Sequence, residues 1–296
     1  MLSLHTNAAA LSAQNSISRT QSSLSTSMTR LSTGFRINSA MDDAAGLQIA
    51  TRLKTQTSGM GVAMRNTQNS ISLMQTAEGA LDETSNILNR MKDLATQAAD
   101  GSSTAADQTA MQKEYDSLTD ELSNIFTNTK FGGTSLLSST GKLTAAITFQ
   151  IGASTGETLS ANFTAELGTT GGGTGAAGLI KAAAAGFTDA GAGAAAGTEL
   201  TGAGTANLAI DKLATAIDAV GALRSKLGAI SNRLDHVYNN LSNISTNTKN
   251  ATGRIMDVDF ASESAQMTSS QMLLQAGTAM LKQSNSQSSL VLSLLQ

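Results

Sequence analysis

The stretch RLSTGFRINSAMDDAAGLQIA, residues 30–50, interrupts a chain whose pattern is helical on both sides of it. It keeps neither the period of a helix nor the alternation of a strand. Gly34 allows a bend, the Asn-Ser pair that follows suits a turn, and the adjacent carboxylates of Asp42 and Asp43 favour the start of a helix. We therefore predict an elbow between two helices at this point.

Apolar residues recur at alternating spacings of three and four over residues 71–98, 111–125 and 210–244. The last segment keeps a nearly heptad spacing for about 35 residues, which is longer than an ordinary globular helix. A sustained repeat of this kind indicates left-handed packing of helices. The predicted fold class is mainly α, a long antiparallel helical bundle or coiled coil from the two termini, with a small β-hairpin region and a Gly-rich segment in the middle.

The middle of the chain, roughly residues 131–204, is rich in Ala, Gly and Thr. The β-branched and aromatic residues of KLTAAITFQIG and ETLSANFTAEL predict a β-hairpin over about 142–167. The stretch after it, 169–204, shows no periodicity, and each glycine lowers helix stability by about 1 kcal/mol. We expect no regular structure there.

The two ends of the chain are helical in pattern but nearly uncharged. Residues 1–29 carry one Arg, one His and no acid, and residues 264–296 carry one Lys. Such helices lack the ion pairs that support exposed helices, and isolated helices are marginal in water. We expect them to pair with each other and with neighbouring copies of the chain, as in an assembly subunit.

The overall composition argues against several classes of protein. With a net charge of −3 and 14% charged residues, the chain has no basic face for nucleic acid. No apolar run approaches the roughly 18 residues of a membrane span, and we expect no cleavable secretory signal. The absence of Cys excludes disulfides, and two His leave little to bind a transition metal.

The groups that an enzyme needs are sparse. None of the common phosphate-binding, dinucleotide-binding, hydrolase or zinc-protease motifs is present. Asp42 and Asp43 are adjacent, so their side chains point to different sides and are poorly placed to share a proton or a metal. His236, Asp257 and Asp259 complete no catalytic constellation. We expect no enzyme activity, no catalytic or metal site and no cofactor.

The segment TRLSTGFRINSAMDDAAGLQIATRL resembles the N-terminal signature of bacterial flagellin. The resemblance continues through NTKFGGTSLL, resumes in LGAISNRLDHVYNNLSNISTNTKNATGRIMDVDF and reaches LVLSLLQ, so that it covers about 1–137 and 205–296. It implies a structural subunit of the extracellular flagellar filament, which self-assembles into a helical tube for swimming after unfolded export through a type III apparatus. The alternative in the same family is the hook–filament junction protein.

The resemblance also implies a division into domains. Residues 1–42 and 256–296 would form an inner coiled-coil domain. Residues 43–168 and 205–255 would form a helical layer that includes the hairpin. Residues 169–204 would be a short variable surface segment.

Three sets of site residues follow from the resemblance and from the faces of the end helices. Subunit contacts are expected at Leu4, Leu11, Leu24, Leu31, Arg36, Asp42, Asp43, Leu273, Met280 and Leu294. Recognition by the vertebrate Toll-like receptor 5 is expected at Arg90, Leu94, Gln97 and Glu114. Candidate O-glycosylation sites are Thr169, Thr170 and Thr174. The implied partners are other flagellin subunits, an export chaperone, the filament cap and the hook-junction proteins, without nucleic acid or membrane insertion.

Two other classes of protein fit the sequence less well. A chemoreceptor would also be long and helical, but it needs membrane spans. A hydrolase carried on a flagellin scaffold would need a catalytic domain in the middle region. The carboxylates of that region are few: Glu157, Glu166, Asp189 and Glu199.

Overall fold

The computed structural model describes residues 7–168, 174–189 and 197–294. The chain forms two compact units, which we call the terminal unit (Met1–Thr57 and Thr246–Gln296) and the central unit (Ser58–Ser245). Two long helices, α2 (Ala44–Ala98) and α6 (Ala203–Met256), contribute to both units. The domain boundaries expected from the sequence fall near the ends of these helices, whereas the division between the compact units falls inside them.

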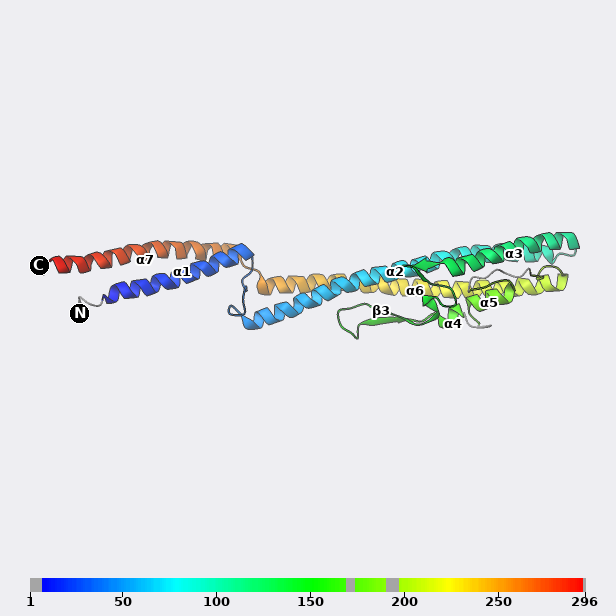
Figure 1. Cartoon of the computed structure of the whole chain (residues 1–296), viewed down its shortest axis with the longest axis horizontal. Coiled ribbons are helices and arrows are strands. Elements are labelled where there is room, and N and C mark those ends of the chain that lie inside the picture. The colour runs from blue at the N-terminus through cyan, green and yellow to red at the C-terminus, as the bar shows by residue number, and fades with distance from the viewer. Residues whose placement is uncertain (1–6, 169–173, 190–196, 295–296) are drawn as a thin grey trace. The chain divides into compact units, whose positions relative to one another are not determined.

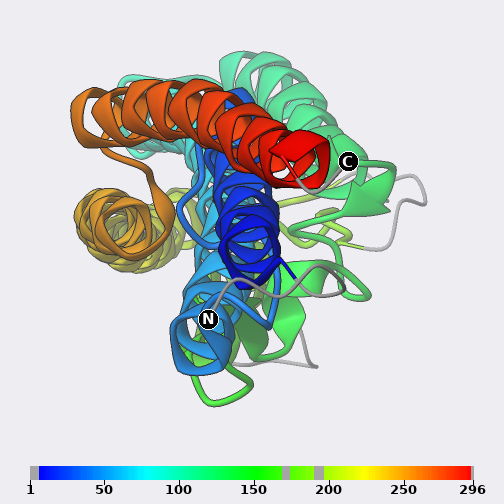
Figure 2. The same cartoon turned by 90° about the vertical axis from the view of Figure 1, so that its left-hand side faces the viewer.

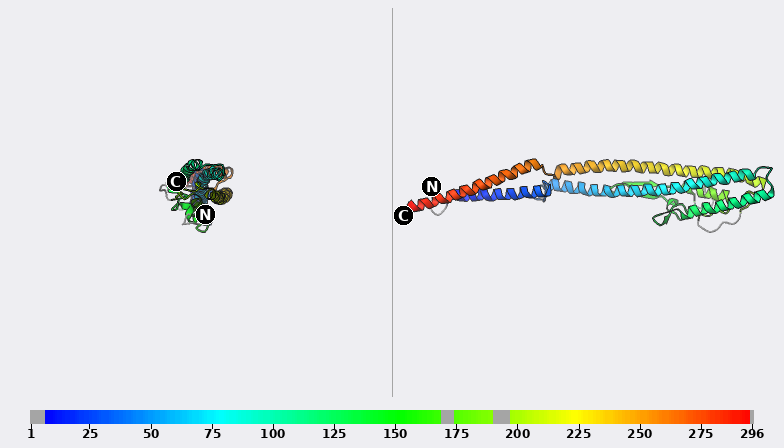
Figure 3. Two further views of the ribbon diagram at one scale, coloured as in Figure 1. Left: turned by 90° about the vertical axis from the view of Figure 1, so that its right-hand side faces the viewer. Right: turned by 90° about the horizontal axis from the view of Figure 1, so that it is seen from above.

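The terminal unit is built on two antiparallel helices, α1 (Ala8–Thr33) and α7 (Phe260–Leu294), which lie side by side (Figures 1 and 3). At one end, the Asn7 side chain donates to the carbonyl oxygen of Ser284 at 3.3 Å. At the other end, Arg30 pairs with Glu263 at 3.6 Å. The predicted antiparallel pairing of the two termini is therefore confirmed.

The seam between α1 and α7 follows the heptad spacing of their sequences. Figure 2 shows the two helices as neighbours, α1 in dark blue and α7 in orange to red. The half-buried or buried positions recur every three or four residues: Ala13, Ile17, Thr20, Leu24, Ser27 and Leu31 in α1, and Met267, Ser270, Leu274, Gly277, Leu281 and Ser284 in α7. A Cβ atom at Gly277 would stand 2.9 Å from Ile17 Cγ1, so this glycine lets the two helices approach closely.

The central unit has the main hydrophobic core. The helices α2, α3 (Ala105–Asn128) and α6 run alongside one another (Figures 1 and 3). Fully buried side chains recur at heptad spacing along two of them: Met74, Leu81 and Leu88 in α2, and Leu213, Val220, Leu227 and Leu234 in α6. These are the faces that the sequence periodicity predicts, because a repeat of about 3.5 residues keeps one face of a helix toward its neighbour.

Two short hairpins follow α3. Strands β1 (Lys130–Phe131) and β2 (Thr134–Ser135) pair around two glycines with positive φ. Strands β3 (Ile147–Gln150) and β4 (Thr158–Ala161) are antiparallel, with Ile147 opposite Ala161.

The hairpin predicted over about 142–167 is thus confirmed at its centre, but its ends are helical. They are a 3₁₀ turn, η1 (Lys142–Thr144), and a short helix, α4 (Thr164–Leu167). Each end buries a leucine, Leu143 and Leu167, in the core, and this burial outweighs the strand pattern.

The expectation of no regular structure over 169–204, and of a surface location for that segment, is wrong for part of it. Helix α5 (Ala176–Ala183) lies there, and Ile180 in the helix and Phe187 after it are buried. The ring of Phe187 meets Phe126 of α3 edge-on, with centroids 5.2 Å apart. A helix of eight residues made largely of Ala and Gly is too short to show a periodic pattern. Residues 169–173 and 190–196 lie outside the described part of the chain.

Helix α3 holds this segment in place through polar contacts as well. The buried Tyr115 hydroxyl donates to the carbonyl oxygen of Ala183 at 2.9 Å. Burial, with the charges of Glu199 and Asp116 nearby, raises the pKa of Tyr115 far above its usual value, so this donor keeps its proton.

Within the described residues, no helix has an apolar stretch long enough to cross a membrane.

Candidate assembly surface

The elbow after α1 begins with a glycine in the left-handed region. Gly34 has φ of 76°, and its N–H donates to the carbonyl oxygen of Arg30 at 2.9 Å. This arrangement ends a helix at a residue without a Cβ atom, which is why glycine is favoured at the position. The predicted bend at Gly34 is confirmed.

The chain beyond the bend is tied to the connection between α6 and α7. The N–H of Val258 donates to the carbonyl oxygen of Gly34 at 3.0 Å, and the N–H of Arg36 donates to the carbonyl oxygen of Met256 at 2.6 Å. The guanidinium of Arg36 adds a hydrogen bond to the carbonyl oxygen of Ile255 at 2.9 Å. The two ends of the chain are therefore joined at the elbow as well as along the helix seam.

Asp42 and Asp43 have separate roles in the elbow. One oxygen of Asp42 accepts hydrogen bonds from the N–H groups of Asn38 at 3.1 Å and Ser39 at 2.9 Å. These backbone donors, Ser39 first, hold the pKa of the Asp42 carboxyl below its usual value. Asp43 instead accepts from the N–H of Gly46 at 2.8 Å, so it caps the first turn of α2. Asp43 starts the helix as predicted, whereas Asp42 organises the preceding turn.

The terminal unit exposes most of the large apolar side chains that lie at the described surface. They are Leu11, Met28, Phe35, Met41, Ile49, Phe260, Met272, Leu273 and Met280, against Val62, Leu208 and Ile244 in the central unit. Burying one such side chain is worth about 1.5–3 kcal/mol. A surface of this kind favours association with another apolar surface.

The residues predicted for subunit contacts fall into four groups. Leu11, Leu273 and Met280 are exposed and lie outside the seam between α1 and α7. Leu24 and Leu31 are half-buried in that seam, so their first contacts are within the chain itself. Leu4 lies outside the described residues, as does the side chain of Leu294 at the end of α7, while Arg36, Asp42 and Asp43 form the elbow.

Met28, Phe260 and Met272 belong to the exposed apolar set but were not among the predicted contact residues. Met28 belongs to the same periodic series as Leu24 and Leu31, and Met272 directly precedes the predicted Leu273. Periodicity predicts that a helix has an apolar side, but it does not show how much of that side the partner helix covers. The periodic signal was present for Met28, but it marked neither Met272, which points to another side of the helix than Leu273, nor Phe260.

The four residues predicted for receptor recognition lie on α2 and α3 in the central unit. Arg90 and Glu114 form an exposed ion pair, in which Nη2 and Nε of Arg90 donate to the same oxygen of Glu114 at 2.6 Å and 2.9 Å. Gln97 is exposed as well. Leu94 is buried in the core, so it packs behind these exposed side chains and is not itself at the surface.

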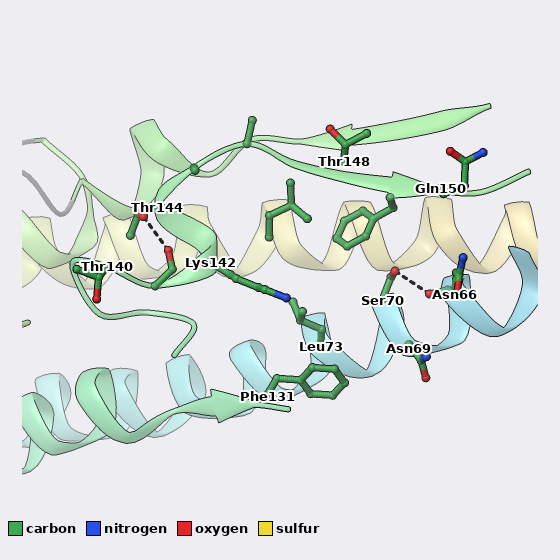
Figure 4. A pocket seen from close by; sticks show the side chains of 15 residues that line it. Asn66, Asn69, Ser70, Leu73, Phe131, Thr140, Lys142, Thr144, Thr148 and Gln150 are labelled. Carbon is green, nitrogen blue, oxygen red and sulfur yellow. Dashed lines mark hydrogen bonds between the residues drawn. The ribbon is translucent and has the colours of Figure 1, made fainter. Parts of the chain in front are cut away.

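A groove of about 740 Å³ lies between α2 and the β3–β4 hairpin (Figure 4). Its lining includes Leu73, Phe131 and Phe149, together with the amide and hydroxyl groups of neighbouring residues. Lys142 is the one charged side chain in this lining, so the groove has no acid–base pair. Within the described part of the chain, no three His, Asp or Glu residues are grouped so that they could hold a metal ion.

The fold and the surface define a helical protein whose paired ends join at an elbow and present apolar side chains to the outside. Two family models match it: the bacterial flagellin N-terminal helical region over residues 4–142 and the bacterial flagellin C-terminal helical region over residues 210–295. Together these matches cover about three quarters of the chain. The chain belongs to the bacterial flagellin family.

Curated relatives and solved structures show the extent of the likeness. Polar flagellin B/D of Vibrio parahaemolyticus serotype O3:K6 is 51% identical over 156 residues, which are 53% of this chain and 40% of that protein. The match thus spans about two fifths of that relative's length.

Two solved structures are also similar. The crystal structure of Bacillus cereus flagellin is 35% identical and matches 60% of this chain and 88% of its own, with a TM-score of 0.46. A putative flagellar hook-associated protein from Vibrio parahaemolyticus is 20% identical and matches 73% of this chain and 100% of its own, with a TM-score of 0.57. The second likeness shows a shared fold.

Proposed function

We propose that the protein is a structural subunit of the bacterial flagellar filament and that it polymerises through its terminal unit. The observation that carries this proposal is the concentration of exposed apolar side chains on paired end helices in a chain of the flagellin family. The protein acts mechanically in this role and catalyses no reaction.

The polymer grows by contacts between different faces of neighbouring subunits. Such heterologous contacts need not close on themselves, so they build an open helical assembly. Leu11, Leu273 and Met280 supply apolar area to these contacts, and the elbow around Arg36 and Asp42 sets the geometry in which α1 and α7 are presented.

Export in an unfolded form, followed by folding at the growing tip in the extracellular filament, fits the composition. The chain has no Cys and no Pro, so refolding is not delayed by disulfide exchange or by proline isomerisation, which takes about 10–100 s without a catalyst. An export chaperone, the filament cap and the hook-junction proteins are the further partners that we propose.

Two surface roles are part of the proposal. The exposed group of Arg90, Gln97 and Glu114 is available for recognition by Toll-like receptor 5. Thr174 is exposed and accessible for O-glycosylation, whereas Thr169 and Thr170 lie outside the described residues.

Seeded polymerisation of the purified full-length chain tests the proposed function. We expect negative-stain electron microscopy to show long filaments extending from short filament seeds. A hook–filament junction protein, the alternative within the family, would bind to the seed ends and stop without adding length. Seeds that neither grow nor bind the protein would refute both roles.

A further inference from the structure

The methionines are divided between the two units according to their exposure. The chain has 12 Met, and the strongly exposed ones within the described residues all belong to the terminal unit: Met28, Met41, Met272 and Met280. The buried ones all belong to the central unit: Met60, Met74, Met91 and Met111. Methionine side chains are therefore packed in the core of the central unit and exposed on the surface of the terminal unit.

Two of the exposed methionines share a helix with a predicted contact residue. Met272 and Met280 of α7 are 61% and 69% exposed, and Leu273 lies between them in the sequence. Residues 273 and 280 are seven positions apart, which brings them to nearly the same side of the helix. Met272 lies about 100° around the helix from Leu273, so it extends the exposed apolar area to an adjoining side of α7.

We propose that Met272 and Met280 are oxidation-sensitive positions of the assembly surface, at which sulfoxide formation weakens polymerisation while the central unit stays folded. This inference rests on the proposed function. The reagent class is a peroxide. The thioether sulfur attacks one peroxide oxygen, an S–O bond forms as the O–O bond breaks, and the sulfur is oxidised by two electrons while hydrogen peroxide is reduced to water.

The physical effect follows from the polarity of the product. A sulfoxide oxygen accepts hydrogen bonds, and burying a polar group without a partner is unfavourable. Burying the sulfoxide in an apolar contact is therefore less favourable than burying the thioether. Because the sulfurs of Met74 and Met91 are fully buried, peroxide reaches them only when the core opens, so the fold of the central unit is spared.

The first arm of the test maps the reaction itself. The monomer is treated with dilute hydrogen peroxide, and peptide mass spectrometry follows sulfoxide formation with time. We expect Met272 and Met280 to be oxidised at least about tenfold faster than Met74 and Met91, since reaction of the buried pair requires opening of a stable core. Equal rates at the four positions would overturn the inference.

The second arm measures assembly after oxidation. The treated wild-type monomer should need a monomer concentration at least about tenfold higher for seeded growth, because the loss of one apolar contact alone is worth about this factor or more. The double variant Met272→Leu with Met280→Leu keeps the apolar volume and has no sulfur there, so it should polymerise after the same treatment. The variant Met41→Leu is the matched control, since Met41 is 97% exposed but lies in the elbow, and it should remain sensitive.

The outcomes separate the inference from the proposed function. If untreated wild-type monomer polymerises and the oxidised monomer polymerises equally well, the inference fails alone. It also fails if the double Leu variant is as sensitive as the wild type. If untreated monomer does not grow on seeds, both fail. Recovery of growth after treatment with methionine sulfoxide reductases would support the inference, because these enzymes restore the thioether.

Discussion

At the scale of single residues, the elbow is the part of the structure that local chemistry determines most directly. Gly34 and Asp43 could be assigned from the sequence because a left-handed helix end and a helix N-cap each depend on a few neighbouring residues. Gln112 could not be assigned in the same way. Its side chain bonds to Glu199 and Leu200, which are 87 and 88 positions further along the chain.

The pKa of Asp42 gives a prediction about acid. In the folded chain the N–H groups of Ser39 and Asn38 keep the pKa of this carboxyl below its ordinary value of 3.8. A lowered folded-state pKa stabilises the turn above the unfolded pKa, and the contribution is lost as the pH falls through the folded value. We expect a titration by nuclear magnetic resonance to place the Asp42 pKa below 3.8, and to return it to about that value in denaturant. A folded-state pKa at or above 3.8 would contradict the assigned hydrogen bonds.

Replacement of Gly34 by Ala tests the left-handed bend. A Cβ atom at this position would meet nothing closer than 3.9 Å, so any cost comes from the backbone conformation, at about 1–2 kcal/mol. Amide hydrogen exchange at Arg36 and Val258 should become about 5- to 30-fold faster. Gly79→Ala is the control, because Gly79 lies in the exposed interior of α2 with open space around it and should gain about 0.5–1 kcal/mol. Unchanged exchange in Gly34→Ala would show that the bend does not need glycine.

At the scale of elements, the long helices were predictable and the short ones were not. A spacing of three and four repeated over several turns is a local signal, and it located α2, α3 and α6. Helix α5 carries no such signal, because its position depends on contacts with residues distant in the sequence, such as the hydrogen bond from Tyr115 of α3 to Ala183. Periodicity also left open which apolar positions the chain itself covers, so Leu24 and Leu11 looked alike in the sequence but differ in the structure.

The attachment of the segment after the hairpin to α3 depends on Gln112. Its amide nitrogen donates to Asp116 at 2.8 Å and to Glu199 at 2.9 Å, and its carbonyl oxygen accepts from the N–H of Leu200 at 2.7 Å. The variant Gln112→Leu leaves these partners without their hydrogen bonds to the side-chain amide in a buried environment. This should lower the free energy of unfolding by about 2–3 kcal/mol. Chemical denaturation measures this loss. The exposed Gln68→Leu on α2 should change stability by less than about 0.5 kcal/mol. Equal effects of the two changes would contradict the role of Gln112.

The role of α7 in assembly can be tested with two leucines of equal exposure. Leu273 in the terminal unit is 60% exposed, and Leu208 in the central unit is 59% exposed. Leu273→Ser should raise the monomer concentration needed for seeded growth about tenfold, because it removes apolar area that assembly buries. Leu208→Ser should leave that concentration unchanged. Sedimentation of seeded samples gives both values, and a larger effect at Leu208 would place the contact surface elsewhere.

At the scale of the whole molecule, the two units divide stability and assembly between them. The central unit buries a continuous core, from Met74 in α2 to Leu234 in α6. The terminal unit pairs its helices along a narrow seam, and most of the exposed large apolar side chains among the described residues belong to it. The sequence indicated this contrast through the low charge of its two ends, but the boundary inside α2 and α6 needed the structure because no change in composition marks it.

Removal of residues 267–296, which takes away most of α7, tests this division most directly. The shortened chain and the full-length chain are compared by thermal unfolding and by electron microscopy after seeding. We predict that the shortened chain keeps the cooperative unfolding transition of the central unit and adds no length to the seeds, while the full-length chain forms long filaments. Normal filaments from the shortened chain would contradict the claim that the terminal unit drives assembly.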